Sequence, residues 1–266
     1  MIRAVFFDID GTLLDSSGQV PESALASIKK LHDQGVLIGI CTGRNPSETR
    51  KFINDYSNLH TDIVIYANGA LAEFKGELIV DKPISKNDVK RVVDELNLQH
   101  IPYWLSGKEQ WYFSIQDLSD IKTILINEEW KRSDYFEPDY HLKNDVYMGE
   151  IFLGKSRKYK VLKSIENIDL VQGMLSGGGY GPIADFYSKS VNKATGVSDC
   201  LSELHMSPNE IMVFGDSFND IPVIRLAGIG VAMGNSSDDV KSTASFVTKD
   251  INADGIEYAL MHFGLI

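Results

Sequence analysis

The sequence predicts an α/β protein whose core is a Rossmann-like, doubly wound parallel sheet, interrupted by an inserted α+β domain. Three observations predict it. In the first 82 residues, short apolar runs typical of buried parallel strands alternate with amphipathic helical stretches. From residue 83 to residue 188 this alternation gives way to paired strand patterns with glycine-rich turns, and from residue 189 it returns. We therefore expect a core domain of residues 1–82 and 189–266 and an insertion of residues 83–188.

The composition is that of an ordinary globular protein with room for one large domain or two modest ones. The chain has 266 residues, of which 43% are hydrophobic and 24% charged, and its formal net charge is −11. This charge disfavours nucleic acid and anionic membranes as partners, because both are bound through clustered Lys and Arg. An anionic small molecule fits, provided that a metal ion and a few fixed cations meet its charge.

Cysteine usage and apolar segments indicate neither secretion nor a membrane location. Cys41 and Cys200 lie in apolar stretches and form no disulfide framework or metal-binding pattern. Asp8 interrupts the apolar N-terminus before it reaches the length of a signal peptide, and no segment approaches a membrane span. We expect a cytoplasmic protein that is a monomer or a weak dimer.

The first predicted strand, Ala4 to Phe7, ends abruptly at two acidic residues. Four consecutive apolar residues are too few for a buried helix but suit a strand covered on both faces. Asp8 and Asp10 follow it, and side chains two residues apart in an extended segment point the same way. Gly11 then allows a bend or a close approach of the backbone to a ligand. An isolated Asp-x-Asp is more often a polar turn, so the rest of the chain decides its meaning.

The remaining core elements continue the alternation. A helical stripe over residues 22–34 ends at Gly35, where a C-terminal glycine belongs. The run Asn-Pro-Ser-Glu at 45–48 opens a second helix, with an Asn cap and Pro at the first helical position. An Asn-Gly pair at 68–69 predicts a hairpin turn. The other expected elements are strands at 36–40, 63–66, 211–214, 229–233 and 246–247, and helices at 192–204 and 254–263.

The insertion combines helices with strands that read as an antiparallel sheet. A helix over residues 85–98 begins at Ser85, and Asp88 completes a capping pattern three residues later. Strand patterns on both sides of residues 107–109 predict a hairpin. The other expected elements are strands at 146–153, 170–175 and 183–187, helices at 119–130 and 155–165, a polar loop at Pro138 and a glycine-rich turn at 176–181.

Polar side chains follow four of the predicted core strands. They are Asp8 and Asp10, Thr42, Asn68, and the group Asp216, Asn219 and Asp220. Each alone is an ordinary loop residue, but carboxyl ends of parallel strands meet at one edge of a sheet, where ligands bind. Two carboxylates ~4 Å apart repel by ~4 kcal/mol at an effective dielectric near 20, so converging aspartates need a cation. Oxygen ligands without nearby His or Cys favour Mg²⁺, and the absence of a GxxxxGK[ST] string disfavours a P-loop nucleotide site.

Four strings in this order resemble the four motifs of the haloacid dehalogenase (HAD) superfamily of phosphohydrolases. They are DIDGTLLD at 8–15, CTGR at 41–44, Lys193 within KSVNKATGV, and GDSFND at 215–220. The insertion lies between the second and third strings, and its mixture of helices and strands resembles the type-IIB cap of the Cof-type sugar-phosphatase subfamily. The resemblance implies a HAD-like core with an inserted cap that determines substrate specificity.

The resemblance also implies a role for each matched residue. Asp8 would attack phosphorus and form an aspartyl-phosphate, and Asp10 would protonate the leaving alcohol and later deprotonate water. Lys193 would neutralise phosphoryl charge. The implied phosphate-binding residues are Ile9, Gly11, Thr42, Gly43, Asn68, Lys193 and Asn219. The implied metal site comprises Asp8, the main-chain carbonyl of Asp10, Asp216, and Asp220, which orients the metal's waters or Lys193.

We therefore expect a Mg²⁺-dependent phosphatase of small phosphorylated metabolites, without an assigned physiological substrate. A haloacid dehalogenase is disfavoured because that chemistry does not use the second aspartate, Asp10. Three alternatives remain: a phosphomutase on the same scaffold, a phospho-accepting switch domain, and a non-catalytic sensor of a phosphometabolite. A switch domain needs about half this length and no insertion, and the presence of both Asp8 and Asp10 argues against a sensor.

The insertion is expected to close over the site and to select the substrate. Its boundaries at 81–83 and 188–190 are polar and suit hinges, although a rigid second domain that only adds stability is the alternative. Its aromatic residues include Tyr103, Trp104, Trp111, Tyr112 and Phe113. Most of them are expected to pack in the insertion's own core, and one or two are expected to be available to stack on a substrate ring.

Overall fold

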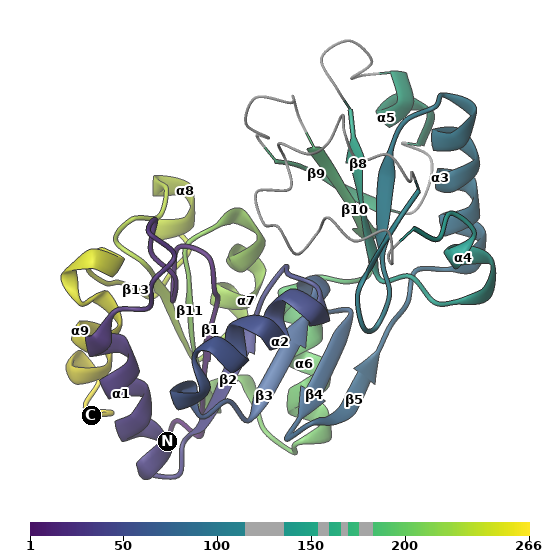
Figure 1. Ribbon diagram of the computed structural model, residues 1–266. Helices are drawn as coiled ribbons and strands as arrows, with labels where there is room; N and C mark the ends of the chain where they lie inside the picture. The colour runs from purple at the N-terminus through teal and green to yellow at the C-terminus, as the bar shows by residue number, and fades with distance from the viewer. Residues whose placement is uncertain (115–135, 154–159, 166–169, 176–182) are drawn as a thin grey trace. The chain divides into compact units, whose positions relative to one another are not determined.

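A computed structural model describes residues 1–114, 136–153, 160–165, 170–175 and 183–266 (Figure 1). The chain forms two compact units. The core unit comprises Met1–Arg44, Glu48–Asp81 and Val191–Ile266, and the insertion unit comprises Asn45–Ser47 and Lys82–Ser190. Across the described part of the chain, no helix is both long and apolar enough to cross a membrane.

An eight-stranded mixed sheet forms the centre of the core unit. Its strands lie in the order β13 (Phe246–Val247), β12 (Ile229–Ala232), β11 (Ile211–Gly215), β1 (Ala4–Phe7), β2 (Leu37–Cys41), β3 (Ile63–Tyr66), β4 (Leu71–Phe74) and β5 (Glu77–Asp81). The six strands from β13 to β3 are parallel, which confirms the predicted doubly wound α/β core. β4 and β5 add two antiparallel strands at one edge. The hairpin turn predicted at residues 68–69 is confirmed, since it joins β3 to the antiparallel β4, but the ranges of β4 and β5 were not predicted.

Strand β1 is central because its residues are apolar on both faces. All four are buried. On one face the ring of Phe6 lies against Gly39 of β2, where a Cβ atom would come within 2.4 Å of the ring. On the other, Phe7 stacks on Phe214 of β11, with ring centroids 5.1 Å apart. The predicted two-sided burial of this strand is confirmed, and it directs the residues after Phe7 to the carboxyl edge of the sheet.

Helices cover both faces of the core sheet. They are α1 (Glu22–Asp33), α2 (Pro46–Asp55), α6 (Lys193–Glu203), α7 (Ile221–Leu226), α8 (Asp238–Lys241) and α9 (Gly255–His262), with short 3₁₀ turns at Ser57–Leu59, Ala67–Gly69, Pro208–Glu210, Phe218–Asp220 and Ile251–Ala253. Figure 1 shows α1 and α2 on one side of the sheet and α6 on the other. From β1 the chain proceeds outward through β2 and β3, and later from β11 outward through β12 and β13. The strand order therefore reverses between β1 and β11, and ligands bind at such a reversal in open α/β sheets.

The insertion unit contains a five-stranded antiparallel sheet, as predicted. Its order is β7 (Trp111–Phe113), β6 (Tyr103–Ser106), β8 (Met148–Phe152), β10 (Ile183–Ser188) and β9 (Leu170–Leu175). Its helices are α3 (Lys86–Leu98), α4 (Tyr140–Lys143) and α5 (Lys160–Ile165). The predicted N-terminal capping of helix α3 is confirmed, since the Ser85 side chain accepts a hydrogen bond from the Asp88 N–H at 3.1 Å. Helix α4 was not predicted.

Three predicted elements of the insertion lie wholly or partly outside the described residues: the helix at 119–130, the first part of the helix at 155–165, and the glycine-rich turn at 176–181. The aromatic residues in the described hairpin pack as expected. Trp104 stacks on Trp111 with ring centroids 4.9 Å apart, and both are buried. The half-buried Tyr112 stacks on Tyr140.

Candidate active site

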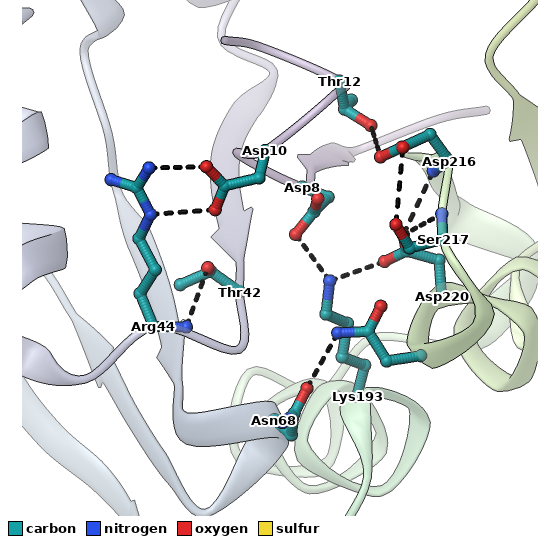
Figure 2. A network of polar contacts seen from close by, with 11 residues as sticks. Asp8, Asp10, Thr12, Thr42, Arg44, Asn68, Lys193, Asp216, Ser217 and Asp220 are labelled. Carbon is teal, nitrogen blue, oxygen red and sulfur yellow. Dashed lines mark hydrogen bonds and ion pairs between the residues drawn. The ribbon is translucent and has the colours of Figure 1, made fainter. Parts of the chain in front are cut away.

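Asp8 lies at the carboxyl end of β1 and is buried. Its N–H donates to the carbonyl oxygen of Phe214 at 3.1 Å, so the strand pairing between β1 and β11 continues to this residue. The residue is 6% exposed. Its carboxylate accepts a hydrogen bond from Lys193 Nζ at Oδ1, 2.5 Å away (Figure 2). The fold thus presents one fixed, desolvated carboxylate at the strand-order reversal.

Lys193 is the first residue of α6, and it is also buried. Helix α6 begins there because the Asn192 side chain caps it by accepting the Thr195 N–H at 3.0 Å. The ammonium group donates both to Asp8 and to Asp220 Oδ1, the latter at 2.6 Å. Although burial alone lowers the pKa of Lys193, the carboxylates of Asp220 and Asp8 raise it above its usual value. The lysine is therefore a permanent cation between two carboxylates.

The loop after β11 is organised by Asp220. Its Oδ2 accepts the main-chain N–H groups of Asp216 and Ser217 at 3.1 and 3.0 Å, while Oδ1 accepts Lys193. Asp216 in turn accepts the Thr12 hydroxyl at 3.1 Å. Four hydrogen-bond donors thus hold two aspartates of the GDSFND string next to the residues that follow β1.

Gly11 permits the close approach of these two loops. Its φ is +82°, in the left-handed region, and a Cβ atom there would lie 2.4 Å from Asp216 Oδ2. Its N–H donates to the Leu14 carbonyl at 2.9 Å, and its carbonyl accepts the Asn235 side chain at 2.8 Å. The structure therefore shows Gly11 packed against Asp216. Its contact with phosphate stays a prediction.

Thr42, Gly43 and Asn68 lie together at the ends of β2 and β3. The Thr42 carbonyl accepts the Asn68 N–H at 3.0 Å. Asn68 adopts φ 55°, ψ 27°, and its Oδ1 accepts Asn219 Nδ2 at 3.0 Å. A Cβ on Gly43 would lie 3.2 Å from the same Asn68 oxygen. These residues, predicted separately as phosphate ligands, are therefore one connected group.

Asp10 differs from Asp8 in both exposure and partner. Its side chain is 62% exposed, and both of its oxygens accept hydrogen bonds from Arg44, at 2.8 Å from Nε and 2.5 Å from Nη2 (Figure 2). Ile9, between the two acids, buries its side chain completely. The Asp10 carboxylate is not part of the cluster of Asp8, Asp216 and Asp220. This agrees with the expectation that Asp10 would contribute only its main-chain carbonyl to a metal site.

Among the described residues, one group of at least three His, Cys, Asp or Glu side chains is close enough to hold a metal ion. It consists of Asp8, Asp216 and Asp220. Their nearest ligand atoms all lie within 4.8 Å of one another. Burial raises the pKa of Asp8 to about 8, although Lys193 acts in the opposite direction. Burial, followed by the charge of Asp220, raises the pKa of Asp216 to about 6. The site therefore stabilises protonated carboxyl groups unless a further cation is bound.

The structure brings all of the predicted polar site residues to one edge of the core sheet. Three contributors were given no role by sequence reasoning: Arg44, Thr12 and Asn235, which hydrogen-bond Asp10, Asp216 and Gly11 respectively. Arg44 and Thr12 lie inside the recognised strings CTGR and DIDGTLLD, so a signal for them was present. Asn235 lies in no such string, and its contact joins residues 224 positions apart.

Comparison with known proteins agrees with this geometry. Residues 5–260 match the family of haloacid dehalogenase-like hydrolases. A Streptococcus pyogenes protein named as a bifunctional phosphatase/peptidyl-prolyl cis-trans isomerase is 32% identical over 271 residues; the match covers 100% of this chain but 54% of that protein, about half its length. A Bacillus subtilis 5-amino-6-(5-phospho-D-ribitylamino)uracil phosphatase is 26% identical, over 99% of this chain and 96% of its own.

A solved structure extends the match to three dimensions. A sugar phosphatase of HAD subclass IIB superposes with a TM-score of 0.80 at 28% identity, over 99% of this chain and 100% of the other. The family match spans nearly the whole sequence, and both the mixed core sheet and the separate antiparallel sheet agree with that subclass. The chain therefore belongs to the haloacid dehalogenase-like hydrolases, and within them it is a phosphatase of the Cof-type, subclass IIB branch.

Proposed function

We propose that this protein hydrolyses phosphate monoesters of small metabolites, such as sugar phosphates, through a phosphorylated Asp8 and with the help of Mg²⁺. The observation that supports this most directly is the position of Asp8. It is a buried carboxylate at the strand-order reversal, in contact with the Lys193 ammonium and close to two further aspartates. Such a carboxylate can act as a nucleophile toward phosphorus once its negative charge is maintained.

In the first half-reaction, an oxygen of Asp8 forms a bond to phosphorus while the bond between phosphorus and the ester oxygen breaks. Asp10, whose carboxylate is exposed to solvent, donates a proton to the departing ester oxygen. Lys193 remains beside Asp8 and meets the negative charge of the phosphoryl group. The products of this step are the free alcohol and the aspartyl-phosphate.

In the second half-reaction, water attacks the phosphorus of the aspartyl-phosphate, and Asp10 accepts the proton that the water loses. The bond between phosphorus and the Asp8 oxygen breaks, which releases inorganic phosphate and restores both aspartates to their starting states. Thr42, the Gly43 amide and Asn219 would bind the phosphoryl oxygens, since they lie together at the same edge of the sheet. Their shared hydrogen bonds hold the group rigid.

The donor set fits Mg²⁺. Within the described residues, the converging ligands are carboxylate oxygens alone, the kind that this ion prefers. Asp8, the main-chain carbonyl of Asp10 and Asp216 would hold it, while Asp220 fixes Lys193 and the loop after β11. When bound, the ion supplies positive charge that keeps the nucleophile ionised despite its burial and that offsets the phosphoryl charge.

We also propose that residues 83–188 form a cap that selects the substrate, whereas the core unit supplies the chemistry. The proposed catalytic groups all come from the core unit. Relatives with the same family fold are named for different substrates, including a phosphorylated ribitylaminouracil, phosphoglycolate and sugar phosphates. A shared core with different leaving groups is expected if a separate domain contacts the part of the substrate beyond the phosphate.

The function is tested by measuring inorganic phosphate released from p-nitrophenyl phosphate and from a panel of phosphorylated metabolites, with and without Mg²⁺. We expect Mg²⁺-dependent release from the aryl ester and from a subset of the metabolites. Binding of the metabolites without phosphate release would instead indicate a sensor. Transfer of the phosphoryl group to another hydroxyl of the same substrate would indicate a phosphomutase.

A further inference from the structure

Arg44 holds the carboxylate of Asp10 in one orientation. Its Nε donates to Asp10 Oδ2 at 2.8 Å and its Nη2 donates to Oδ1 at 2.5 Å, so the two groups meet side by side through both oxygens (Figure 2). This two-point contact fixes the plane of the carboxylate as well as its position, which a single hydrogen bond does not. Among the described residues, no other group donates a hydrogen bond to the Asp10 carboxylate.

Arg44 is itself fixed from several directions. Its N–H donates to the Thr42 hydroxyl oxygen at 3.1 Å, and its carbonyl accepts the Ala67 N–H at 2.9 Å. The guanidinium carbon lies 6.0 Å from the centroid of the buried Phe52 ring. The Arg44 side chain is 28% exposed, compared with 62% for Asp10. The more rigid partner of the pair is therefore the arginine.

We infer that Arg44 is a positioning residue that aims the Asp10 carboxylate at the leaving-group oxygen. This inference rests on the proposed function, in which Asp10 transfers the proton. An exposed aspartate has several rotamers of similar energy, whereas proton transfer requires an approach of about 2.6–3.2 Å between heavy atoms. Each carboxylate oxygen has two lone-pair sites, and Arg44 uses one on each, so a site on each oxygen remains for the transferred proton.

The other use for an arginine in this place is to bind the phosphoryl group directly. The two roles predict different kinetics. An arginine that binds phosphate contacts every substrate equally, so its loss lowers kcat/KM for all phosphate esters alike. An arginine that positions the proton donor matters only where the leaving oxygen needs a proton. Loss of positioning therefore spares esters of acidic phenols and affects esters of ordinary alcohols.

The test compares kcat/KM of wild type, Arg44→Met and Arg44→Lys on p-nitrophenyl phosphate and on an alkyl sugar phosphate that the wild-type protein hydrolyses. kcat/KM reports the steps up to departure of the leaving group, so slower hydrolysis of the aspartyl-phosphate does not obscure the comparison. We expect Arg44→Met to lower the value by about 10²-fold on the alkyl ester and by less than about threefold on the aryl ester. Arg44→Lys, which keeps the charge but not the two-point contact, should fall between wild type and Arg44→Met.

Two controls separate this role from a structural one. Arg3 pairs with Glu210 at the opposite end of β1, and Arg3→Met should leave the ratio of the two kcat/KM values unchanged. Asp10→Asn should reproduce the preference for the aryl ester, and adding Arg44→Met to it should cost little more on the alkyl ester, because both changes act on one proton transfer. Fully additive losses would overturn the inference.

Equal losses on both esters in Arg44→Met and Arg44→Lys would also overturn it, in favour of phosphate binding or a general structural role. If Arg44→Met fails to fold, as judged by its thermal unfolding, Arg44→Lys alone decides between these outcomes. If the wild-type protein releases phosphate from neither of the two esters, the proposed function itself is wrong. That result is distinct from one in which the wild type is active and the variants show no leaving-group preference.

Discussion

Lys193 Nζ lies 2.6 Å from Asp220 Oδ1, and this ion pair is fully buried. The same ammonium also contacts Asp8, so a single cation joins helix α6 to the residues after β1 and after β11. Three separate segments of the chain thus share one charge, and the loss of that charge would leave two buried carboxylates without a cationic partner.

Lys193→Met should therefore lower stability as well as activity. We expect the free energy of unfolding to fall by about 3–5 kcal/mol, as for other buried pairs that lose one member. Because a divalent cation would partly replace the missing charge, the loss should be smaller in Mg²⁺ than in EDTA. Urea unfolding under both conditions measures this. An unchanged unfolding midpoint would contradict the role given to the buried pair.

Asp8→Asn should abolish turnover and preserve the fold. Asparagine keeps the size of the side chain and can still accept the Lys193 hydrogen bond, but it cannot attack phosphorus to form the acyl phosphate. We expect kcat to fall by at least about 10³-fold, with a melting temperature close to that of the wild type. Mass spectrometry must exclude deamidation back to aspartate. Substantial residual activity in a preparation free of aspartate would rule out the covalent mechanism.

Removal of divalent metal should abolish activity, and Mg²⁺ should restore it. Ca²⁺ should bind without restoring activity, because its larger and less regular oxygen shell suits in-line phosphoryl transfer poorly. Mg²⁺ should also raise the melting temperature, since its proposed ligands Asp8 and Asp216 converge in the folded state and not in the unfolded chain. Full activity in excess EDTA would show that the cluster of Asp8, Asp216 and Asp220 does not hold a metal ion needed for catalysis.

Gly11→Ala should reduce both stability and affinity for Mg²⁺. The new Cβ would lie 2.4 Å from Asp216 Oδ2 and displace that carboxylate. Gly18→Ala is a matched control, because Gly18 has a similar φ of +76° but no atom within 4 Å of the added methyl group. Both variants should lose about 1–2 kcal/mol from the left-handed backbone. Only Gly11→Ala should lose more and raise the Mg²⁺ concentration needed for half-maximal activity. Equal behaviour would contradict the importance of this contact.

Asp185→Asn should stabilise the protein at pH 8 more than at pH 4. Asp185 lies on β10 opposite Glu150, and its Oδ1 finds no hydrogen-bond partner in the described parts of the chain. Burial raises the pKa of Asp185 to about 7, whereas an unfolded aspartate titrates near pH ~3.9. Between these values the unfolded state has lost a proton that the folded state keeps, so stability falls as the pH rises through this window.

Thermal unfolding of the two proteins from pH 4 to pH 8 measures this difference. The gain from Asp185→Asn should be small at pH 4, grow through pH 5–7 and level off above about pH 7, where the folded wild type has also ionised. Glu109→Gln, in the exposed hairpin turn of the same sheet, should change stability by less than about 0.5 kcal/mol throughout. A gain that is independent of pH would contradict the assigned ionisation.

The sequence predicted the core strands because their burial on both faces leaves a clear local signal. The run Ala4–Phe7 and the capped start of α3 at Ser85 are examples. It predicted the hairpin turn at residues 68–69 but not the ranges of β4 and β5, since an antiparallel edge pair with exposed residues such as Leu78 lacks the continuous apolar pattern of the central strands. Helix α4 was missed because four residues are too few to show helical periodicity.

The identity of the site residues was predictable where they lie in recognised strings. The contacts between side chains from different strings were not. Asp8, Thr42, Lys193 and Asp216 were selected from their order and positions. The Arg44–Asp10 pair was not, because nothing in the sequence indicates that a long side chain will reach a carboxylate 34 residues away. The bond between Asn219 and Asn68, 151 residues apart, likewise depends on the packed geometry of two loops.

The central place of β1 also affects how the protein is made on the ribosome. Ala4 pairs with Ile211, so 207 further residues must be synthesised after Ala4 before its partner on that side is complete. At about 5–20 residues per second this takes on the order of 10–40 s. During that interval the β11-facing edge of β1 exposes unpaired backbone groups and an apolar surface, a combination that favours aggregation. Slow, long-range closure of the sheet therefore makes nascent chains of this protein candidates for protection by chaperones until β11 emerges.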